Sequence, residues 1–218
     1  MGARRLFLVR HGRVDHDARR FRTSPRGRQW DPPLGDVGRE QAAALAARLA
    51  LMKLPAAVHV SPFTRCVQTV QPYLDATGLA ATLDEDIGEV FIGAWEGLSF
   101  EEIVSGNAEL ARRFREFEAM FSMAPGGESA HQLRARAVPA IDRMLDAAPD
   151  GDVLVVTHGG VINAYLGDVL GIDEDMFFLP ENASINTVVA DGDRRRVRFL
   201  NDTRHVTDPQ VFIPPAAD

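Results

Sequence analysis

Residues 152–160 read Asp-Val-Leu-Val-Val-Thr-His-Gly-Gly, and this stretch decides the fold. Its four consecutive apolar residues predict a strand buried on both faces, because a strand with one face in water alternates apolar and polar residues. The glycines after His158 end this strand, and residues 161–170 predict a helix behind it. The same order occurs near the start of the chain, where Leu-Phe-Leu-Val at 6–9 runs into Arg10, His11 and Gly12.

Strands and helices alternate along the rest of the chain. Short apolar runs predict further strands at 56–60, 79–83, 185–190 and 196–200. Helices are predicted at 36–52, at 63–76 and over most of 99–148. This alternation predicts an α/β fold with a mostly parallel central sheet flanked by helices. No internal repeat or linker divides the sequence, so we expect residues 1–218 to form a single domain.

Local signals set the expected ends and breaks of these elements. Asp36 is expected to cap the helix that follows it, and Gly78 to end the helix at 63–76. Pro139 should kink or interrupt the last part of the 99–148 region. Residues 12–35 contain Gly, Pro and Arg without periodicity and predict a long functional loop. An apolar stripe in the 99–148 region is formed by Ile103, Leu110, Phe114, Phe117 and Phe121.

Composition excludes several classes of protein. The 218 residues are 45% hydrophobic and 25% charged, as is usual for globular proteins and not for disordered or fibrous chains. Cys66 is the one cysteine, so an intrachain disulfide and a cysteine-rich zinc site are both excluded. No apolar run approaches the ~20 residues of a membrane span, and residues 1–9 are too short for a secretory signal. We therefore expect a soluble, cytoplasmic protein.

The net charge of −7 argues against nucleic acid and anionic membranes as partners, but the charge is unevenly distributed. Residues 10–28 contain seven arginines and two aspartates, whereas 84–102 contain seven carboxylates and no lysine or arginine. Arginine is suited to binding phosphate or carboxylate groups. The arginine-rich stretch indicates a small anionic ligand bound locally, although a solvated loop would give the same pattern.

Ionisable side chains follow three of the predicted strands. In open α/β sheets, ligands bind beyond the carboxyl ends of strands, so Arg10, His11, Arg65 and His158 are expected to converge there. Arginine pairs bind phosphate oxygens, the amides after Gly12 and Gly159 could point at the same anion, and a neutral imidazole can accept a phosphoryl group. The leaving group then needs a proton. Glu89 is the candidate acid, with Glu96 as its rival.

Six blocks of sequence, in order, resemble the histidine phosphatase superfamily, which includes the cofactor-dependent phosphoglycerate mutases. The resemblance covers residues 4 to about 206. The blocks are Leu8-Val9-Arg10-His11-Gly12, Gly38-Arg39-Glu40-Gln41-Ala42, Ser61-Pro62-Phe63-Thr64-Arg65, Glu89 to Gly97, Gly127-Glu128-Ser129 and Val155-Val156-Thr157-His158-Gly159-Gly160. The fold implied is phosphoglycerate mutase-like, with a helical insertion at about 99–148 that covers the site.

The resemblance also implies roles for individual residues. His11 would be the phosphorylated nucleophile, and Arg10, Arg65 and His158 would hold the phosphate. Glu89 would donate a proton to the leaving group and then activate water. No metal and no organic cofactor are implied.

The sequence departs from the family pattern just after the first histidine. Arg13 and Val14 stand where the family often has Glu or Gln and then Thr or Ser. Asp17 stands where many members have an asparagine that contacts phosphate. An ionised Asp17 would repel phosphate unless it points away or is offset by an arginine. Arg13 is a candidate for the missing contact.

The favoured function is a metal-independent phosphomonoesterase acting on a small phosphorylated metabolite through phosphohistidine. A cofactor-dependent phosphoglycerate mutase is the first alternative, although Trp95-Glu96-Gly97 and the 69 positions from Glu89 to His158 resemble the phosphatase branch. A non-catalytic protein that binds a phosphate ligand is the second. Residues 13–30 and 91–125 are expected to form the pocket walls, and they leave sugar phosphates, phosphoglycerates, nucleotides and aryl phosphates open. Apolar residues at 211–213 could pack within the chain or form a homodimer.

Overall fold

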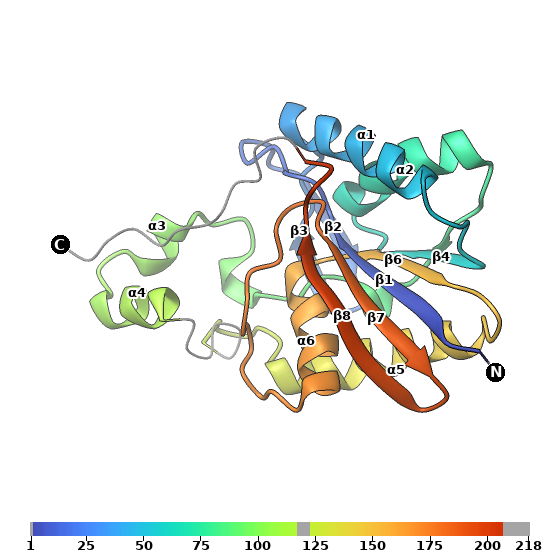
Figure 1. Cartoon of the computed structure of the whole chain (residues 1–218). Coiled ribbons are helices and arrows are strands. Elements are labelled where there is room, and N and C mark those ends of the chain that lie inside the picture. Colours follow the sequence, from blue (N-terminus) through green and yellow to red (C-terminus); the bar gives the residue numbers. More distant parts are fainter. Residues whose placement is uncertain (1, 117–122, 207–218) are drawn as a thin grey trace.

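A six-stranded sheet forms the centre of the protein in a computed structural model, which describes residues 2–116 and 123–206. Its spatial order is β5-β4-β6-β1-β7-β8 (Figure 1). The first four strands in this order run parallel to one another. Strand β7 pairs antiparallel with β1, and β8 pairs antiparallel with β7. The predicted α/β class with a mostly parallel sheet is therefore confirmed. The bounds are β1 Arg4–Arg10, β4 Ala57–Val60, β5 Thr82–Leu83, β6 Val153–Thr157, β7 Ile185–Asp191 and β8 Arg194–Asp202.

Strand β6 lies between β4 and β1, and all five of its residues are buried. Its register with β1 places Thr157 beside Arg10, the last residue of each strand. Since the two strands are parallel and end level, the residues that follow them must emerge side by side. This pairing brings the two His-Gly sequences to one edge of the sheet.

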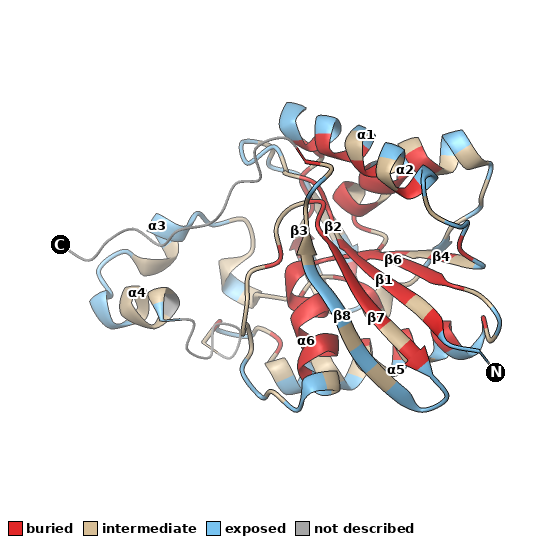
Figure 2. Cartoon of the chain, viewed as in Figure 1, coloured by how far each residue is buried: buried red, intermediate tan, exposed pale blue. Residues whose placement is uncertain are grey.

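Two helices cover each face of the sheet (Figure 1). Helices α1 (Asp36–Ala50) and α2 (Thr64–Thr77) pack together on one face, and α5 (Ala130–Asp146) and α6 (Gly159–Leu170) on the other. The side chains of β1 alternate between these layers, as the period of a strand requires. Figure 2 shows that the buried residues concentrate in the sheet and on the helix faces against it.

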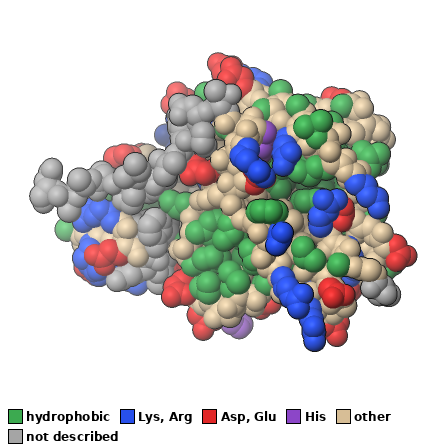
Figure 3. All heavy atoms as spheres, viewed as in Figure 1, with side chains coloured by type: hydrophobic (Ala, Val, Ile, Leu, Met, Phe, Trp, Pro, Cys, Tyr) green, Lys and Arg blue, Asp and Glu red, His purple; other side chains and the backbone are tan. Residues whose placement is uncertain are grey.

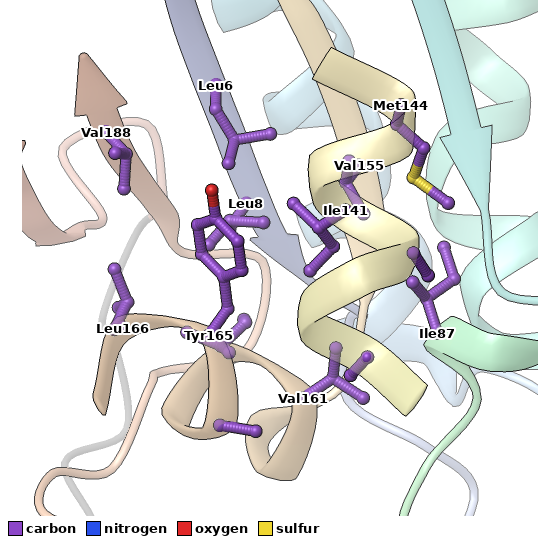
Figure 4. Packing of buried hydrophobic residues seen from close by; sticks show 14 of the residues in the cluster. Leu6, Leu8, Ile87, Ile141, Met144, Val155, Val161, Tyr165, Leu166 and Val188 are labelled. Atoms are coloured by element: carbon purple, nitrogen blue, oxygen red, sulfur yellow. The ribbon is translucent and has the colours of Figure 1, made fainter. Parts of the chain in front are cut away.

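Each layer encloses its own apolar cluster. Leu6 and Leu8 of β1 pack with residues of α5 and α6, including Ile141 and Tyr165 (Figure 4). Their neighbours Phe7 and Val9 point the other way, into the cluster with α1 and α2. Packing on both faces is what makes β1 an almost uninterrupted apolar run.

The segments between these layers are less regular. Two 3₁₀ helices (Glu85–Ile87 and Gly93–Trp95) follow β5, and α3 (Phe100–Val104) and α4 (Ala108–Arg115) project to one side of the sheet (Figure 1). On the face drawn in Figure 3, apolar side chains gather over the segment leading from α6 to β7. Within the described residues, no helix combines the length and apolar character that crossing a bilayer would require.

Four local predictions were wrong or fall outside the described residues. Residues 12–35 include a hairpin of β2 (Phe21–Ser24) and β3 (Gly27–Trp30), because cross-strand pairing supplies an order that periodicity does not reveal. Gly35, not Asp36, occupies the N-cap of α1. Helix α5 runs through Pro139 without a break, so the predicted interruption is wrong, while the alternative of a kink stays a prediction. Phe117, Phe121 and the 211–213 segment lie outside the described residues.

Candidate active site

A cleft of about 310 Å³ lies beyond the carboxyl ends of β1 and β6. Arg10, His11, Arg65, Glu89 and Gly159 all line it. His158 is fully buried beside it, and its ring meets that of His11 edge-on at a centroid distance of 5.2 Å. The fold therefore produces the predicted convergence of Arg10, His11, Arg65 and His158, and it places Glu89 with them.

His11 is held in one tautomer by its own loop. Its Nδ1 lies 2.8 Å from the carbonyl oxygen of Gly12, which can only accept a hydrogen bond. The proton of the neutral ring must therefore sit on Nδ1, which leaves the lone pair on Nε2. The carbonyl oxygen of His11 in turn accepts a hydrogen bond from Asn182 at 3.0 Å. Because backbone contacts fix the ring, Nε2 can be aimed at an electrophile in the cleft.

Gly12 allows this loop to pack against α1. A Cβ added at Gly12 would lie 2.8 Å from the carbonyl oxygen of Gly38, and one at Gly38 would lie 2.0 Å from that of Arg13. Both contacts are closer than real Cβ atoms make. The Gly12 amide donates to the Thr69 hydroxyl at 2.9 Å. The amide after Gly12, that of Arg13, donates to Gln41 at 2.8 Å, so it does not point at an anion as the sequence suggested.

His158 is oriented from the opposite side. The hydroxyl of Ser61 lies 2.7 Å from its Nε2, and Nδ1 lies 3.9 Å from Oε2 of Glu89. Phe63 packs edge-on against the imidazole at 4.9 Å. With Ser61 as donor, the ring proton of His158 sits on Nδ1, on the side of Glu89.

Two guanidinium groups supply the positive charge of the cleft. Nε of Arg10 is buried and makes no hydrogen bond within the described protein, while another of its nitrogens donates to the carbonyl of Pro180. Arg65 lies over the ring of Phe63 at 4.5 Å and donates to the carbonyl of Trp30 at 3.2 Å. A phosphate oxygen would satisfy the buried Arg10 donor, whose desolvation is otherwise costly.

Burial moves the pKa values in the direction that nucleophilic catalysis needs. Burial, together with the charge of Arg65, holds the pKa of His11 well below 6.5, and the same two causes lower the pKa of His158. Burial raises the pKa of Glu89 above 4.5, against the opposing charge of Arg65. The site therefore favours a neutral imidazole facing a protonated carboxyl group.

The rival acid, Glu96, is engaged elsewhere. One of its carboxylate oxygens accepts from the Trp30 amide at 2.7 Å, and the other from the Ile92 amide at 3.1 Å. Glu89 uses one oxygen, Oε1, to accept from its neighbour Val90, while Oε2 faces His158. Burial raises the pKa of both groups, but Glu89 has the oxygen better placed for proton transfer.

Comparison with known proteins agrees with this geometry. The sequence profile of the histidine phosphatase superfamily, branch 1, matches residues 6–203. The chain belongs to the histidine phosphatase superfamily. This confirms the family resemblance seen in the sequence.

Individual relatives support the assignment to the histidine phosphatases. A bifunctional protein of Mycobacterium tuberculosis is 34% identical over 206 residues, which are 93% of this chain and 55% of that protein. The chain thus spans about half the length of this relative. A glucosyl-3-phosphoglycerate phosphatase of Mycolicibacterium vanbaalenii is 32% identical, with 80% of this chain and 78% of that protein aligned.

The fold of this chain also matches a solved structure. The native structure of a mycobacterial glucosyl-3-phosphoglycerate phosphatase superposes with a TM-score of 0.76 at 28% identity. The match covers 92% of this chain and 99% of that one. The phosphoglycerate mutase-like architecture predicted from the sequence is confirmed.

Two predicted phosphate contacts are not brought to the cleft. Neither Arg13 nor Asp17 is among the lining residues. The backbone of Arg13 is tied to α1, with its amide donating to Gln41 at 2.8 Å, and Asp17 is exposed. Their roles in binding phosphate stay predictions that this geometry does not support.

The walls of the cleft were predicted only in part. Val14, His16, Gln29 and Trp30 come from the expected 13–30 range, and Ile92 and Glu96 come from 91–125. No described residue of 99–148 lines the cleft, so the described part of the helical insertion does not cover it. Met176 and Leu179 line it but were not predicted, because residues 171–180, which follow α6, have no motif or periodicity.

His11, Glu89 and His158 are also the residues that could hold a metal ion. Their ligand atoms lie within 4.8 Å of one another. However, Arg10 and Arg65 line the same cleft and would repel a cation. The electrostatics of this cleft favour an anion.

Proposed function

We propose that the protein is a metal-independent phosphomonoesterase that works through a phosphohistidine on Nε2 of His11. The observation that carries this proposal is the fixed tautomer of His11, with Nδ1 against the Gly12 carbonyl and the lone pair on Nε2. Arg10 and Arg65 would neutralise the phosphoryl oxygens, and Glu89 faces the same cleft. A nucleophile, a charge clamp and an acid are the three parts that covalent phosphoryl transfer requires.

The first step transfers the phosphoryl group to the protein. The Nε2 lone pair of His11 attacks phosphorus, the ester P–O bond breaks, and the leaving oxygen takes the proton of Glu89. Burial keeps that proton on the carboxyl group to a higher pH than is usual for glutamate. The buried Nε of Arg10 donates to a phosphoryl oxygen as charge develops there.

The second step returns the protein to its starting state. Glu89, now ionised, takes a proton from water, and the oxygen attacks the phosphohistidine. The P–N bond breaks, inorganic phosphate leaves, and Nε2 regains its lone pair. A mutase would run the same first step and pass the phosphoryl group to a second alcohol instead of to water.

The phosphoenzyme is the direct test. Wild-type protein mixed with ³²P-labelled phosphomonoester and denatured in alkali should retain label that acid removes, as expected for phosphohistidine. His11→Ala should retain none and should lose turnover. His131→Ala changes an exposed histidine on α5 and should behave as wild type.

Three other results would count against the proposal. Label retained by His11→Ala would identify another nucleophile. Loss of activity in EDTA that added metal restores would contradict metal independence. Interconversion of 2- and 3-phosphoglycerate primed by bisphosphoglycerate, faster than hydrolysis, would favour the mutase alternative. Action in the cytoplasm on a small metabolite, with no nucleic acid or membrane partner, remains part of the proposal.

A further inference from the structure

We propose that the alcohol released from the substrate is uncharged and largely apolar, such as an aromatic or alicyclic alcohol. This inference rests on the proposed phosphatase function. It concerns the part of the cleft beyond the phosphate, where the leaving group would bind. The chemistry at His11 does not determine which leaving group that is. Three features carry it: the charges available, the composition of the walls and the fixed position of Trp30.

The two arginines of the cleft are already assigned to the phosphoryl group. Arg10 and Arg65 are the arginines among its described lining residues, which include no lysine. Both are needed for the phosphoryl group. Residues 117–122 and 207–218, outside the described structure, contain no lysine, arginine or histidine in the sequence. A carboxylate on the leaving group would therefore find no lysine or arginine to pair with, and an unpaired charge is costly to bury.

Three other arginines of the arginine-rich stretch are held by other groups. Arg22 makes two hydrogen bonds to the carboxylate of Glu85, at 3.0 and 2.5 Å. Arg26 donates to the carbonyl oxygen of Glu85 at 2.9 Å. Arg19 donates to the carbonyl oxygen of Gly97. These contacts hold the three guanidinium groups away from an anionic leaving group.

A cationic leaving group fits no better. Arg10 and Arg65 would repel it, and Glu89 must be protonated to act as the acid. The remaining carboxylate, Glu96, accepts backbone hydrogen bonds at both oxygens. A buried cation would therefore meet two like charges and no free carboxylate.

The walls beyond the phosphate are mainly apolar. Val14, Trp30, Ile92, Met176 and Leu179 contribute from four separate segments of the chain. Burying an apolar group against such walls is favourable at roughly 25 cal/mol per Å². Apart from His11 and the charged side chains already described, the polar lining residues are His16 and Gln29, which provide hydrogen-bonding groups.

Trp30 is a rigid part of this wall. Its amide donates to Glu96, its indole Nε1 donates to the carbonyl of Ala18 at 2.9 Å, and its carbonyl accepts from Arg65. The ring also lies beside His16, at 5.9 Å between centroids. Because every polar group of Trp30 has a partner, the indole offers a fixed aromatic face without further ordering.

A substrate panel tests the inference. Benzyl phosphate, methyl phosphate, phosphoserine, 3-phosphoglycerate and phosphocholine all release an alcohol whose hydroxyl is on a saturated carbon. Differences among them therefore reflect the cleft more than leaving-group reactivity. We expect kcat/KM for benzyl phosphate to exceed each of the others by about tenfold or more. Trp30→Ala should lower the preference for benzyl over methyl phosphate by about tenfold.

A gain-of-function variant keeps the test independent of folding defects. Met176→Arg places a cation on the half-buried cleft wall, and Met176→Gln is its uncharged match. The arginine variant should raise the ratio of kcat/KM for 3-phosphoglycerate over benzyl phosphate by at least about tenfold relative to the glutamine variant.

The outcomes separate this inference from the proposed function. Wild-type hydrolysis of phosphoserine, 3-phosphoglycerate or phosphocholine at or above the rate for benzyl phosphate would overturn the inference and leave the phosphatase intact. An unchanged benzyl preference in Trp30→Ala would do the same. Failure to hydrolyse any of the five esters, with no labelled phosphoenzyme, would overturn both.

Discussion

At the scale of single residues, the site contains ionisable groups whose pKa values are shifted by burial. A histidine in water is protonated below about pH 6.5, and a glutamate ionises above about 4.3. In this cleft the pKa of His11 falls and that of Glu89 rises, each chiefly through burial. The two shifts widen the range in which a neutral nucleophile coexists with a protonated acid, and that pair is what phosphoryl transfer to histidine needs.

The pH profile should reveal this pair. We expect kcat/KM to fall in acid as His11 is protonated, at a pH below 6.5, and to fall on the alkaline side as Glu89 loses its proton, at a pH above 4.5. In Glu89→Gln the alkaline limb should disappear, with turnover of an alkyl phosphate reduced about 10²–10⁴-fold. Steady-state rates at each pH, for wild type and variant, provide the measurement.

A second substrate and a second variant serve as controls for that interpretation. 4-Nitrophenyl phosphate releases a stable phenolate, so Glu89→Gln should slow its hydrolysis much less than that of an alkyl phosphate. Glu96→Gln should keep the alkaline limb, because Glu96 supports the Trp30 and Ile92 amides instead of donating a proton. Equal slowing of both substrates by Glu89→Gln would point to another acid.

At the scale of elements, the site is made by two parallel strands that end level. Strands β1 and β6 both run into a His-Gly sequence, and their pairing fixes the distance between the two imidazoles. The loop after β1 is then pressed onto the first turn of α1, where Gly12 and Gly38 allow the backbones to approach closely. The position of His11 therefore depends on a glycine in a helix that does not line the cleft.

This dependence predicts the effect of one methyl group. In Gly38→Ala the new Cβ would lie 2.0 Å from the carbonyl oxygen of Arg13, so the loop carrying His11 must shift. We expect unfolding free energy to fall by about 1–3 kcal/mol, together with a loss of kcat. Thermal denaturation and steady-state kinetics measure the two effects.

Gly159 provides the matched comparison. It is also a glycine in the first turn of a helix, but an added Cβ would find its nearest neighbour, Nε of Arg10, at an ordinary 3.8 Å. Gly159→Ala should therefore keep the wild-type Tm while raising KM, because its methyl group lies beside the donor proposed to hold phosphate. If Gly38→Ala were as stable as wild type, the close approach of the loop after β1 to helix α1 would not be structurally important.

The elements that the sequence predicted are those with a repeating physical signal. Buried parallel strands give continuous apolar runs, so β1 and β6 and the residues after them could be located before the structure was known. The hairpin of β2 and β3 has no such signal, because its order comes from pairing across a turn. Met176 and Leu179 enter the cleft through a segment whose path depends on tertiary packing. Arg13 and Asp17 were predicted from their places in a motif, and the course of the loop takes them elsewhere.

At the scale of the whole molecule, the net charge of −7 conceals a local balance. The arginine-rich stretch 10–28 faces part of the acidic stretch 84–102, where Arg22 and Arg26 contact Glu85. Of the arginines in this stretch, Arg10 is the one that lines the cleft, and Arg65 of α2 lines it too. The anion binding predicted for the whole stretch is therefore expected at these two residues. An acidic protein that nevertheless binds phosphate must do so through local guanidinium groups, since its overall field repels anions.

Binding of inorganic phosphate should consequently stabilise the whole fold. At a concentration about 100-fold above its Kd, a ligand specific for the native state adds about 2.7 kcal/mol to the unfolding free energy. For a chain of this size that corresponds to a rise in Tm of roughly 5–10 °C. Differential scanning fluorimetry in phosphate, against chloride at equal ionic strength, measures the shift.

Two arginine variants decide whether the effect is local. Arg10→Gln removes the buried donor of the cleft, and the phosphate-induced rise in Tm should largely vanish relative to that variant's own Tm. Arg20→Gln removes the same charge from an exposed position in the same stretch and should keep the full rise. If both variants lost the phosphate-induced rise in Tm equally, the rise would depend on the overall charge of the stretch and not on the cleft. Loss in Arg10→Gln alone would show that one buried guanidinium group overcomes the repulsion of an acidic protein.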